Sequence, residues 1–369
     1  MTVPVTGSPG RWARLLRRRP LVLLLVALLV GGVAVGAEAG RRATPGGDVR
    51  VMYPAALTNL MEDWVRPAFE RSSRFAFLGE GSGSLAMAQL IKDRIKAPDV
   101  FISSDPSVDA ALRGAANGSF VSWWVTLART QLVVAWNPAS TFGPLFTEVR
   151  EQLRTVESVL ELPGLRLCRA DPDLDPQGYQ TLFALQLDQA RSGQAGLSGA
   201  ILGSDRNPNV SGALRGASGQ IFGAETLTTR LQSGACDAAF LYEVQVLDAA
   251  LPFVTLPPAV DLSDPAESPL YATASYVGPG GQRFTGAPIT FTITIPATTR
   301  NAAGAVAFVR FLLGASGQQV LAEQGLLPQP ATAGGDAGKV PAVVASLLAT
   351  PTNTATSPPT SGASDAPAG

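Results

Sequence analysis

Three acidic side chains lie in one short loop of this chain. Asp171, Asp173 and Asp175 alternate with prolines in RADPDLDPQGY, and the apolar-periodic run TLFALQLDQA follows. The periodicity predicts a helix, and the strand-like LRLC precedes the loop. Backbone N–H groups at a helix N-terminus attract anions. A carboxylate in such a place indicates a bound species that accepts an oxygen ligand.

A purely structural interpretation of the same loop stays open. Aspartate directly before a helix is a preferred N-cap, and Asp-Pro is typical of turns. These residues alone do not separate a cap and turn from a binding loop.

Other predicted helix starts carry polar groups that could contact the same ligand. Glycine lets the backbone approach a ligand, and serine adds a hydroxyl, although a Gly/Ser turn with Ser84 as helix cap is an equal alternative. Glu225 in a first helical turn and Tyr242 at a strand end also have ordinary structural explanations. The candidate ligand-binding residues are Ala56 and Thr58 in the loop YPAALT, Ser82 and Ser84 in GEGSGS, then Asp175, Glu225 and Tyr242.

Composition excludes several classes of function. The 369 residues are 46% apolar and 15% charged, and the formal net charge is −1, so nothing favours nucleic acid as a partner. The chain contains no histidine, which excludes His-based catalytic triads and His metal ligands. Two cysteines are too few for a Cys-rich zinc site.

The N-terminus is typical of a targeting segment. Arginines between Arg11 and Arg19 precede the apolar run Leu21–Val35, and Ala37-Glu38-Ala39 offers a small-x-small cleavage site. We interpret residues 1–39 as a signal peptide or an N-terminal anchor, because the apolar run is close to the length that spans a bilayer. The protein is therefore expected to be extracytoplasmic, either secreted or membrane-anchored.

Export changes the interpretation of the two cysteines. Cys168 precedes the acidic loop and Cys236 begins the strand-like CDAAFLY. The two form a disulfide if these strands are neighbours, and otherwise they are two buried thiols.

From residue 48 the chain alternates predicted strands and helices. This rhythm predicts an α/β fold of two lobes, each a mostly parallel sheet flanked by helices, with a ligand cleft between the lobes. The strand-like segments LVVAWNP and ITFTITIP would be the crossovers. The expected divisions are a spacer at 40–47, lobe 1 at 48–138 plus 288–328, lobe 2 at 139–287, and a low-complexity, disordered tail at 329–369.

Several motifs in one order resemble those of a known family. They are GEGSGS, PDVFISSD, RADPDLDPQGYQTLFALQL, SGACDAAFLYEVQV, LPPAVDLSDP and GAPITFTITIP, between Val49 and Pro328. Together they resemble the archaeal-type tungstate/molybdate-binding proteins of ABC importers, within the type II periplasmic solute-binding family. The resemblance implies a non-enzymatic monomer without a cofactor that binds tungstate or molybdate and delivers it to an ABC transporter permease in the membrane.

The resemblance also implies roles for individual residues. Asp175 matches the family's aspartate ligand, Ser84 its second-loop serine and Tyr242 its tyrosine, and Glu225 lies within one residue of the glutamate ligand. The family's first-loop serine falls on Ala56, for which nearby Thr58 is a candidate substitute.

The carboxylates suit such a ligand chemically. An ionised aspartate would repel sulfate or phosphate, whereas the Mo or W centre of molybdate or tungstate accepts further hard oxygen ligands. On this hypothesis Asp175 and Glu225 bind the metal centre directly.

Three other interpretations stay open. The chain could bind another oxyanion, such as sulfate or phosphate. It could be a secreted enzyme or a calcium binder that uses the three loop aspartates. It could also be a degenerate surface domain that has lost its ligand, as the alanine at position 56 suggests.

Overall fold

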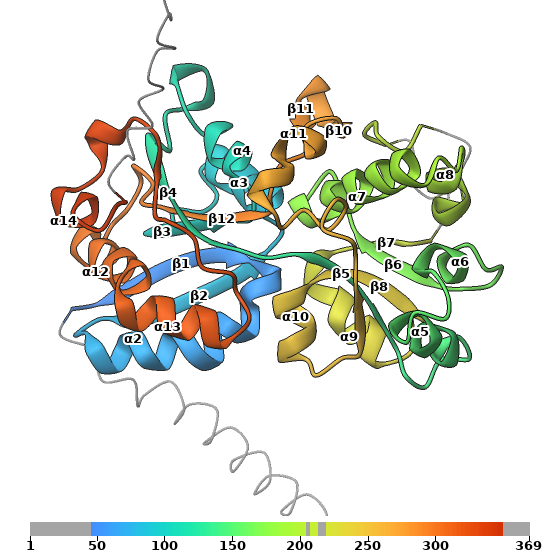
Figure 1. The fold of residues 1–369 in the computed structure, drawn as a ribbon. Coiled ribbons are helices and arrows are strands. Elements are labelled where there is room, and N and C mark those ends of the chain that lie inside the picture. Colours follow the sequence, from blue (N-terminus) through green and yellow to red (C-terminus); the bar gives the residue numbers. More distant parts are fainter. Residues whose placement is uncertain (1–45, 204–206, 213–218, 350–369) are drawn as a thin grey trace, which may run out of the picture. The chain divides into compact units, whose positions relative to one another are not determined.

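The computed structural model describes residues 46–203, 207–212 and 219–349, so the expected targeting segment lies outside the described residues. Two mixed sheets, each flanked by helices, organise the described chain, and we call each sheet with its helices a lobe (Figure 1). The two-lobe α/β fold expected from the sequence is confirmed.

The sheet of the first lobe has the strand order β13-β4-β12-β3-β1-β2. Its strands are β1 (Asp48–Pro54), β2 (Ala76–Ser82), β3 (Val100–Ser103), β4 (Trp123–Arg129), β12 (Thr290–Thr294) and β13 (Ala333–Gly335). Its helical segments are η2 (Ala55–Leu57), η3 (Leu60–Val65), α2 (Arg66–Ser72), α3 (Ser84–Lys92), α4 (Pro106–Ala110), η4 (Ala115–Asn117), α12 (Ala302–Leu313), α13 (Ala315–Glu323), η8 (Ala337–Lys339) and α14 (Ala342–Ala345).

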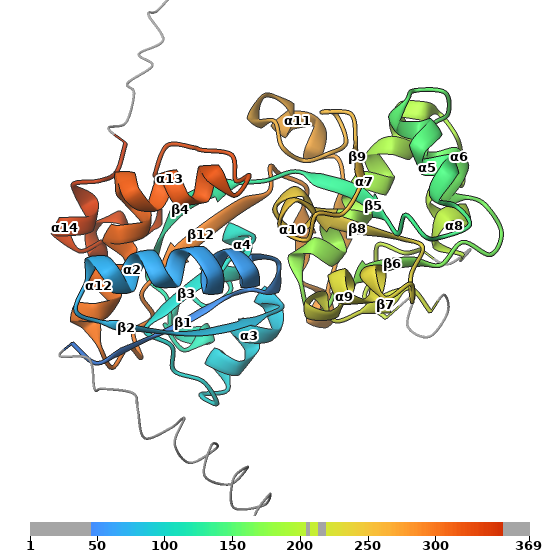
Figure 2. The same cartoon turned by 90° about the horizontal axis from the view of Figure 1, so that it is seen from below.

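Helices cover both faces of this sheet, with α2 and α12 on one side and α3 on the other (Figure 2). Successive residues of β1 point to opposite faces, as the pleat requires. Val51 belongs to the core that contains Phe69 of α2, whereas Met52 packs in the cluster that contains Met87 of α3. Burial on both faces explains why the second half of β1, from Val51 onward, is continuously apolar.

The sheet of the second lobe has the order β7-β6-β8-β5-β9. Its strands are β5 (Leu132–Trp136), β6 (Leu167–Ala170), β7 (Ile221–Phe222), β8 (Ala238–Tyr242) and β9 (Phe253–Thr255), and a separate hairpin joins β10 (Ser275–Val277) to β11 (Arg283–Thr285). The helical segments are α5 (Gly143–Arg150), α6 (Val156–Leu160), α7 (Pro176–Ser192), α8 (Leu197–Leu202), η5 (Ala224–Thr226), α9 (Leu227–Gln232), α10 (Glu243–Asp248), η6 (Pro265–Glu267), α11 (Ser268–Tyr271) and η7 (Pro279–Gly281).

Both sheets contain more antiparallel pairing than the βαβα rhythm suggested. In the first, β1 pairs in parallel with β2 and β3, but β12 runs antiparallel to β3 and β4. In the second, β6 is parallel to β8, whereas β5 is antiparallel to β8 and β9. β5 and β12 each enter their sheet from the opposite lobe, and they therefore run against the neighbouring strands β8 and β3 of the βα units.

The crossover also lies earlier than expected. Lobe 1 was expected to extend to residue 138, but β5 pairs with β8 and β9 and so belongs to the second sheet. LARTQLVVAWNP is two strands, and the chain crosses at Thr130 and Gln131 between β4 and β5. The polar run from Arg129 to Gln131 marks this break, but the whole segment was expected to be one strand.

Two terminal expectations need correction as well. Part of the expected disordered tail is ordered: β13 pairs with β4, and Val344 of α14 is fully buried. Backbone pairing to a sheet edge needs few large side chains, which is why composition missed it. At the other end, two residues expected in the spacer form backbone hydrogen bonds: the N–H of Gly46 donates to the carbonyl oxygen of Arg74, and the carbonyl oxygen of Gly47 accepts from the N–H of Ala76. Residues 40–45 and 350–369 lie outside the described residues.

Within the described ranges, no single helix is long and apolar enough to cross a membrane, and only the bent pair α12 and α13 meets the length and composition test together.

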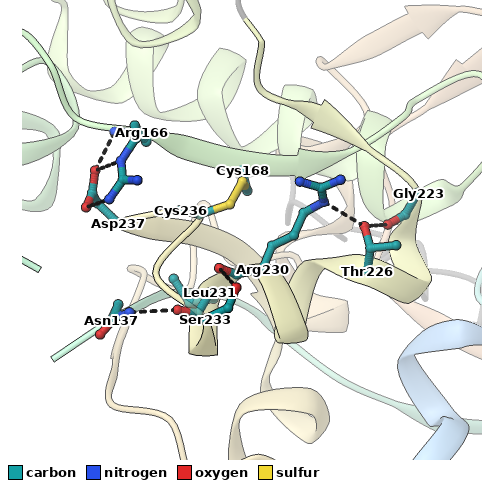
Figure 3. The surroundings of a disulfide bond; sticks show 10 residues. All are labelled: Asn137, Arg166, Cys168, Gly223, Thr226, Arg230, Leu231, Ser233, Cys236 and Asp237. Atoms are coloured by element: carbon teal, nitrogen blue, oxygen red, sulfur yellow. Dashed lines mark hydrogen bonds and ion pairs between the residues drawn. A yellow bond between two sulfur atoms is a disulfide. The ribbon is translucent and has the colours of Figure 1, made fainter. Parts of the chain in front are cut away.

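A disulfide joins Cys168 of β6 to Cys236, just before β8 (Figure 3). The two strands are parallel neighbours, and the disulfide expected for that case is confirmed. The nearby Asp237 accepts hydrogen bonds from the guanidinium of Arg166 at 2.7 and 2.9 Å (Figure 3). This pair adds a second link between the beginnings of the same two strands. The bridge thus ties together the two strands that lead to the acidic loop and to Tyr242.

Replacing both cysteines by serine (Cys168→Ser with Cys236→Ser) is expected to lower the free energy of unfolding by about 2–4 kcal/mol. The bridge spans 68 positions, and its removal frees that loop in the unfolded chain. Urea unfolding would measure the loss. Reductant should destabilise the wild type by a similar amount and leave the double variant unchanged. Equal stability of the two oxidised proteins would contradict the prediction.

Candidate functional site

The N-terminal ends of two long helices, one from each lobe, meet at Asp175. This residue caps α7, and its Oδ1 accepts a hydrogen bond from the backbone N–H of Gln177 at 2.8 Å. Its Oδ2 accepts from the backbone N–H of Ser84, the first residue of α3, at 3.0 Å. One carboxylate therefore lies at the positive ends of two helices. The cap interpretation of Asp175 is correct, and it does not exclude a role in binding.

Two glycines permit this close approach. A Cβ on Gly83 would lie 2.5 Å from the carbonyl oxygen of Leu174 in the other lobe, and one on Gly178 would lie 2.5 Å from the backbone nitrogen of Pro172. The N–H of Ala86 also donates to Leu174 across the lobes at 3.0 Å. Any side chain at position 83 would push the two helix ends apart.

Hydroxyl and amide groups extend the contact around Ser84. Its Oγ lies 3.2 Å from the Oγ of Ser104, at the end of β3. Gln180 of α7 connects Ser104 to Tyr242. Its amide nitrogen donates to the carbonyl oxygen of Ser104 at 3.4 Å, and its amide oxygen accepts from Tyr242 Oη at 2.5 Å. These four side chains are almost entirely buried. Ser84, Asp175 and Tyr242, far apart in sequence, thus belong to one polar network.

A second bond links the lobes beside this network. Tyr179 Oη of α7 donates to Asp105 Oδ2 at 2.8 Å, while Asp105 Oδ1 accepts from the backbone N–H of Ser107 and caps α4. Asp105 repeats in the first lobe the arrangement of Asp175 in the second, with a carboxylate at a helix start that also contacts the opposite lobe.

Burial controls the protonation of Asp175. Burial and, to a smaller extent, the nearby charge of Glu225 raise its pKa to about 7, against the lowering effect of the N–H donors of Gln177 and Ser84. Burial also raises the pKa of Tyr242 well above its usual value, so this phenol stays protonated and remains a hydrogen-bond donor. Near neutral pH both the protonated and the ionised form of Asp175 are therefore accessible, whereas Tyr242 stays protonated.

A cavity of about 510 Å³ lies next to the network and between the lobes. The first lobe contributes Ala56, Thr58 and Gly81, and the second contributes Glu225, Gln245 and Asp248, among others. No lysine or arginine of the described chain lines this cavity. An anion inside it would meet carboxylates and neutral donors rather than a compensating cation.

Gln245 connects the cavity to the buried network. It lines the cavity, and its side-chain oxygen accepts from the backbone N–H of Tyr242 at 2.9 Å and from the amide of Gln177 at 3.0 Å. The predicted residues therefore fall into two adjacent groups. Ser84, Asp175 and Tyr242 form the buried network, whereas Ala56, Thr58 and Glu225 line the cavity.

The remaining candidates lie at the margins. Thr58 is exposed, and its hydroxyl donates to the carbonyl oxygen of Ala55 at 2.8 Å. Ser82 is half-buried at the end of β2. Glu225 is exposed in η5, close enough for its charge to act on Asp175.

The other two aspartates of the acidic loop have structural roles. Asp171 Oδ1 accepts from the backbone N–H of Asp173 at 2.9 Å, and Asp173 accepts from the hydroxyls of Tyr276 and Ser211. In the described part of the chain, no three His, Cys, Asp or Glu side chains are grouped so that they could hold a metal ion. The three loop aspartates thus do not converge on one point.

Sequence reasoning missed Asp105, Tyr179, Gln180 and Gln245. Asp105 had a signal, since it follows a predicted strand and precedes Pro106 at a helix start, but that pattern is equally typical of a turn. Tyr179 and Gln180 read as part of an amphipathic helix, and only the meeting of the lobes gives them polar partners.

A family model for bacterial extracellular solute-binding proteins matches residues 49–327. The chain belongs to this family. The members are solute-binding proteins rather than enzymes, so the expectation of a binding function is supported at that level.

Relatives whose names state a ligand are consistent with this family. A Haloferax volcanii protein named "Putative ABC transporter molybdenum-binding protein" is 32% identical over 72% of this chain and 79% of its own length. The molybdate/tungstate-binding protein WtpA of Thermococcus kodakarensis is 22% identical over 67% of this chain and 71% of its own. These names confirm the resemblance to archaeal proteins of this type.

Among solved structures, the periplasmic molybdate-binding protein of Azotobacter vinelandii is similar, with a TM-score of 0.50 and 17% identity over 76% of this chain and all of that one. At this identity the likeness concerns the fold alone.

Replacing Asp175 by asparagine should change how the stability of the ligand-free protein depends on pH. Because the folded state raises the pKa of Asp175, this residue stabilises the fold fully below its usual pKa and loses that contribution as pH rises through about 7. The melting temperature of the wild type relative to Asp175→Asn should therefore fall between about pH 4 and pH 8.

Asp264 provides the matched control, because it caps η6 through the N–H of Ala266 away from the lobe contact. If Asp264→Asn produced the same slope, the effect would come from replacing a capping aspartate and not from the buried site.

Proposed function

We propose that this protein is an extracytoplasmic receptor that binds molybdate or tungstate between its lobes and delivers it to an ABC importer. It acts as a monomer, it needs no cofactor, and its partner is a transmembrane permease. The names of the relatives support this ligand class, and the residues of the cleft provide an independent chemical argument for it.

One observation carries the proposal. The Asp175 carboxylate is buried where the N-termini of α3 and α7 meet, beside a cavity between the lobes that Glu225 lines. Helix N-termini favour the oxygens of a bound oxyanion. Two carboxylates at the same place disfavour that anion, unless they bind its central atom.

Molybdate and tungstate resolve this conflict, whereas sulfate and phosphate do not. A Mo(VI) or W(VI) centre can add oxygen ligands beyond its four oxo groups, so Asp175 and Glu225 would become ligands to the metal. The hydroxyls of Ser84 and Tyr242 and the N–H groups of α3 would then bind the oxo groups. The ligand would replace the bonds that Asp175 now makes across the lobes.

Release requires the lobes to separate. Opening would break the Asp175–Ser84 and Tyr179–Asp105 hydrogen bonds, which both cross between the lobes. The short link at Thr130 and Gln131 joins the two sheets and can absorb the change in backbone angles, as hinges do. Charged residues at the lobe contact would therefore set the balance between open and closed forms.

Calorimetric titration with tungstate, molybdate, sulfate and phosphate should show heat of binding for the first two only. Asp175→Ala should weaken binding roughly hundredfold or more, since even outer partners of a bound metal contribute about 10- to 100-fold. The control Asp264→Ala should leave the affinity unchanged. Failure of all four anions to bind would support a degenerate domain and would contradict the proposal.

Proton exchange during the same titration separates coordination from simple anion binding. With a pKa of about 7, Asp175 must lose about half a proton at pH 7 when it binds a metal centre. Buffers of different ionisation enthalpy would measure this release. Uptake of protons instead would mean that Asp175 donates a hydrogen bond to an uncoordinated oxyanion.

Ala56→Ser is expected to strengthen tungstate binding by up to about tenfold, because it adds a hydroxyl donor to a wall of the cavity. Thermal shift at fixed tungstate concentration would detect the gain, with Ala116→Ser, at an exposed position outside the cavity, as the control. Unchanged or weaker binding would show that position 56 does not face the ligand.

A further inference from the structure

A second cavity, of about 400 Å³, lies on the first lobe away from the lobe contact. Four cationic residues line it: Arg50 of β1, Arg94 and Lys96 after α3, and Arg300 before α12. Ser84 begins α3 at the ligand cleft, and the nine residues of that helix place its other end about 14 Å away. The cavity is therefore separate from the cleft and opposite to it in charge.

Positive charge is in excess here. Glu80 is the one acidic residue that lines the cavity, and it pairs with Lys96 at 2.9 Å. Within the described residues, the guanidinium groups of Arg50, Arg94 and Arg300 form no ion pair. Buried Asp99 lies nearby, but its oxygens accept from the backbone N–H groups of Arg50 and Arg300 at 2.9 and 2.8 Å. The side chains of these arginines remain available for an anion.

Apolar groups accompany the cations. Ile95 is 65% exposed between Arg94 and Lys96, and Leu78 on the edge strand β2 is also exposed. Arg94 has a positive φ of 58°, which turns the chain sharply at the end of α3 and presents Ile95 to solvent. An exposed aliphatic residue flanked by cations is the combination that binds the surface of an anionic bilayer.

The start of the described chain is beside this cavity. Asn301, next to Arg300, donates through its side-chain amide to the carbonyl oxygens of Gly46 and Asp48 at 3.2 and 3.0 Å. Ten residues, 36–45, separate Gly46 from the apolar run Leu21–Val35, and they can span at most about 35 Å. If that run stays in a membrane, the cationic cavity lies within its reach.

We propose that this cavity binds the phosphate groups of anionic phospholipids and holds the first lobe against the membrane surface. Arg50, Arg94 and Arg300 bind the phosphates, and Ile95 enters the interface between the headgroups and the acyl chains. The first lobe is then fixed at the bilayer, while the second lobe remains free to move. This role is independent of which anion enters the cleft.

Hydrogen exchange of the full chain in vesicles tests the proposal. Vesicles of phosphatidylcholine with phosphatidylglycerol should protect the amides of residues 93–97, whereas pure phosphatidylcholine vesicles should not. The variant with Arg50→Gln, Arg94→Gln and Arg300→Gln should lose this protection, because each cation near an anionic surface contributes roughly fivefold to association. Ile95→Ser should reduce the protection in the same vesicles.

The matched control carries Arg71→Gln, Arg283→Gln and Arg310→Gln, three exposed arginines outside the cavity. It loses the same net charge and should keep the protection. Unchanged melting temperatures for both triple variants would show that the fold is intact.

Two further samples test whether the anion bound in this cavity comes from the lipid or from solution. Inorganic phosphate or poly-glutamate, added with pure phosphatidylcholine vesicles, should not protect residues 93–97. Protection by free phosphate would assign the cavity to a soluble anion, and protection by poly-glutamate alone would assign it to an acidic protein surface. Either result, or equal protection in both kinds of vesicle, would overturn the proposal.

Discussion

The buried carboxylate of Asp175 is the interaction on which the arrangement of the two lobes depends. It satisfies N–H groups at the start of α3 in one lobe and of α7 in the other. A carboxylate in that position is costly to ionise, because it has lost its water, and favourable to ionise, because helix dipoles and N–H donors surround it. The cost of lost water exceeds the gain from these donors, and the pKa of Asp175 therefore rises to about 7.

The topology of the sheets explains why such different residues meet there. β2, β3 and β8 end at the contact between the lobes. Ser84 follows β2 at the start of α3, Ser104 follows β3, and Tyr242 is the last residue of β8. In α/β sheets the carboxyl ends of the strands are where ligands bind. The glycine at position 83 then lets the two helix ends approach closely enough for a single carboxylate to bridge them.

The first lobe has two faces of opposite chemical character. Its cleft side presents hydroxyl groups and N–H donors toward the carboxylates of the second lobe. The cavity beyond the far end of α3 is lined by arginines that form no ion pair with any other described residue. Keeping strong cations out of the cleft matters, because a lysine or arginine there would pair with Asp175 and compete with any ligand for it. The arginines lie instead at the second cavity, where they do not pair with Asp175.

Much of the fold was predictable because burial produces local patterns. The alternation of apolar strands and amphipathic helices identified two α/β lobes, and the motif RADPDLDPQGY located the cap at Asp175. The break at Thr130 and Gln131 was missed although polar residues stand there, because a short polar interruption also occurs within single half-buried strands. It also missed β13, whose Ala-Gly-Gly sequence contributes backbone hydrogen bonds and almost no side-chain signal.

The sequence by itself determined which residue types were present: a histidine-free chain with a capping aspartate, glycine-serine loops and two cysteines. Only the tertiary structure decided which of them act together. It separated Asp175 from Asp171 and Asp173, joined it to Ser84 across 91 positions, and recruited Asp105, Tyr179 and Gln245. The physical reason is that caps and turns depend on neighbours in sequence, whereas a polar network between lobes depends on long-range packing that no local pattern records.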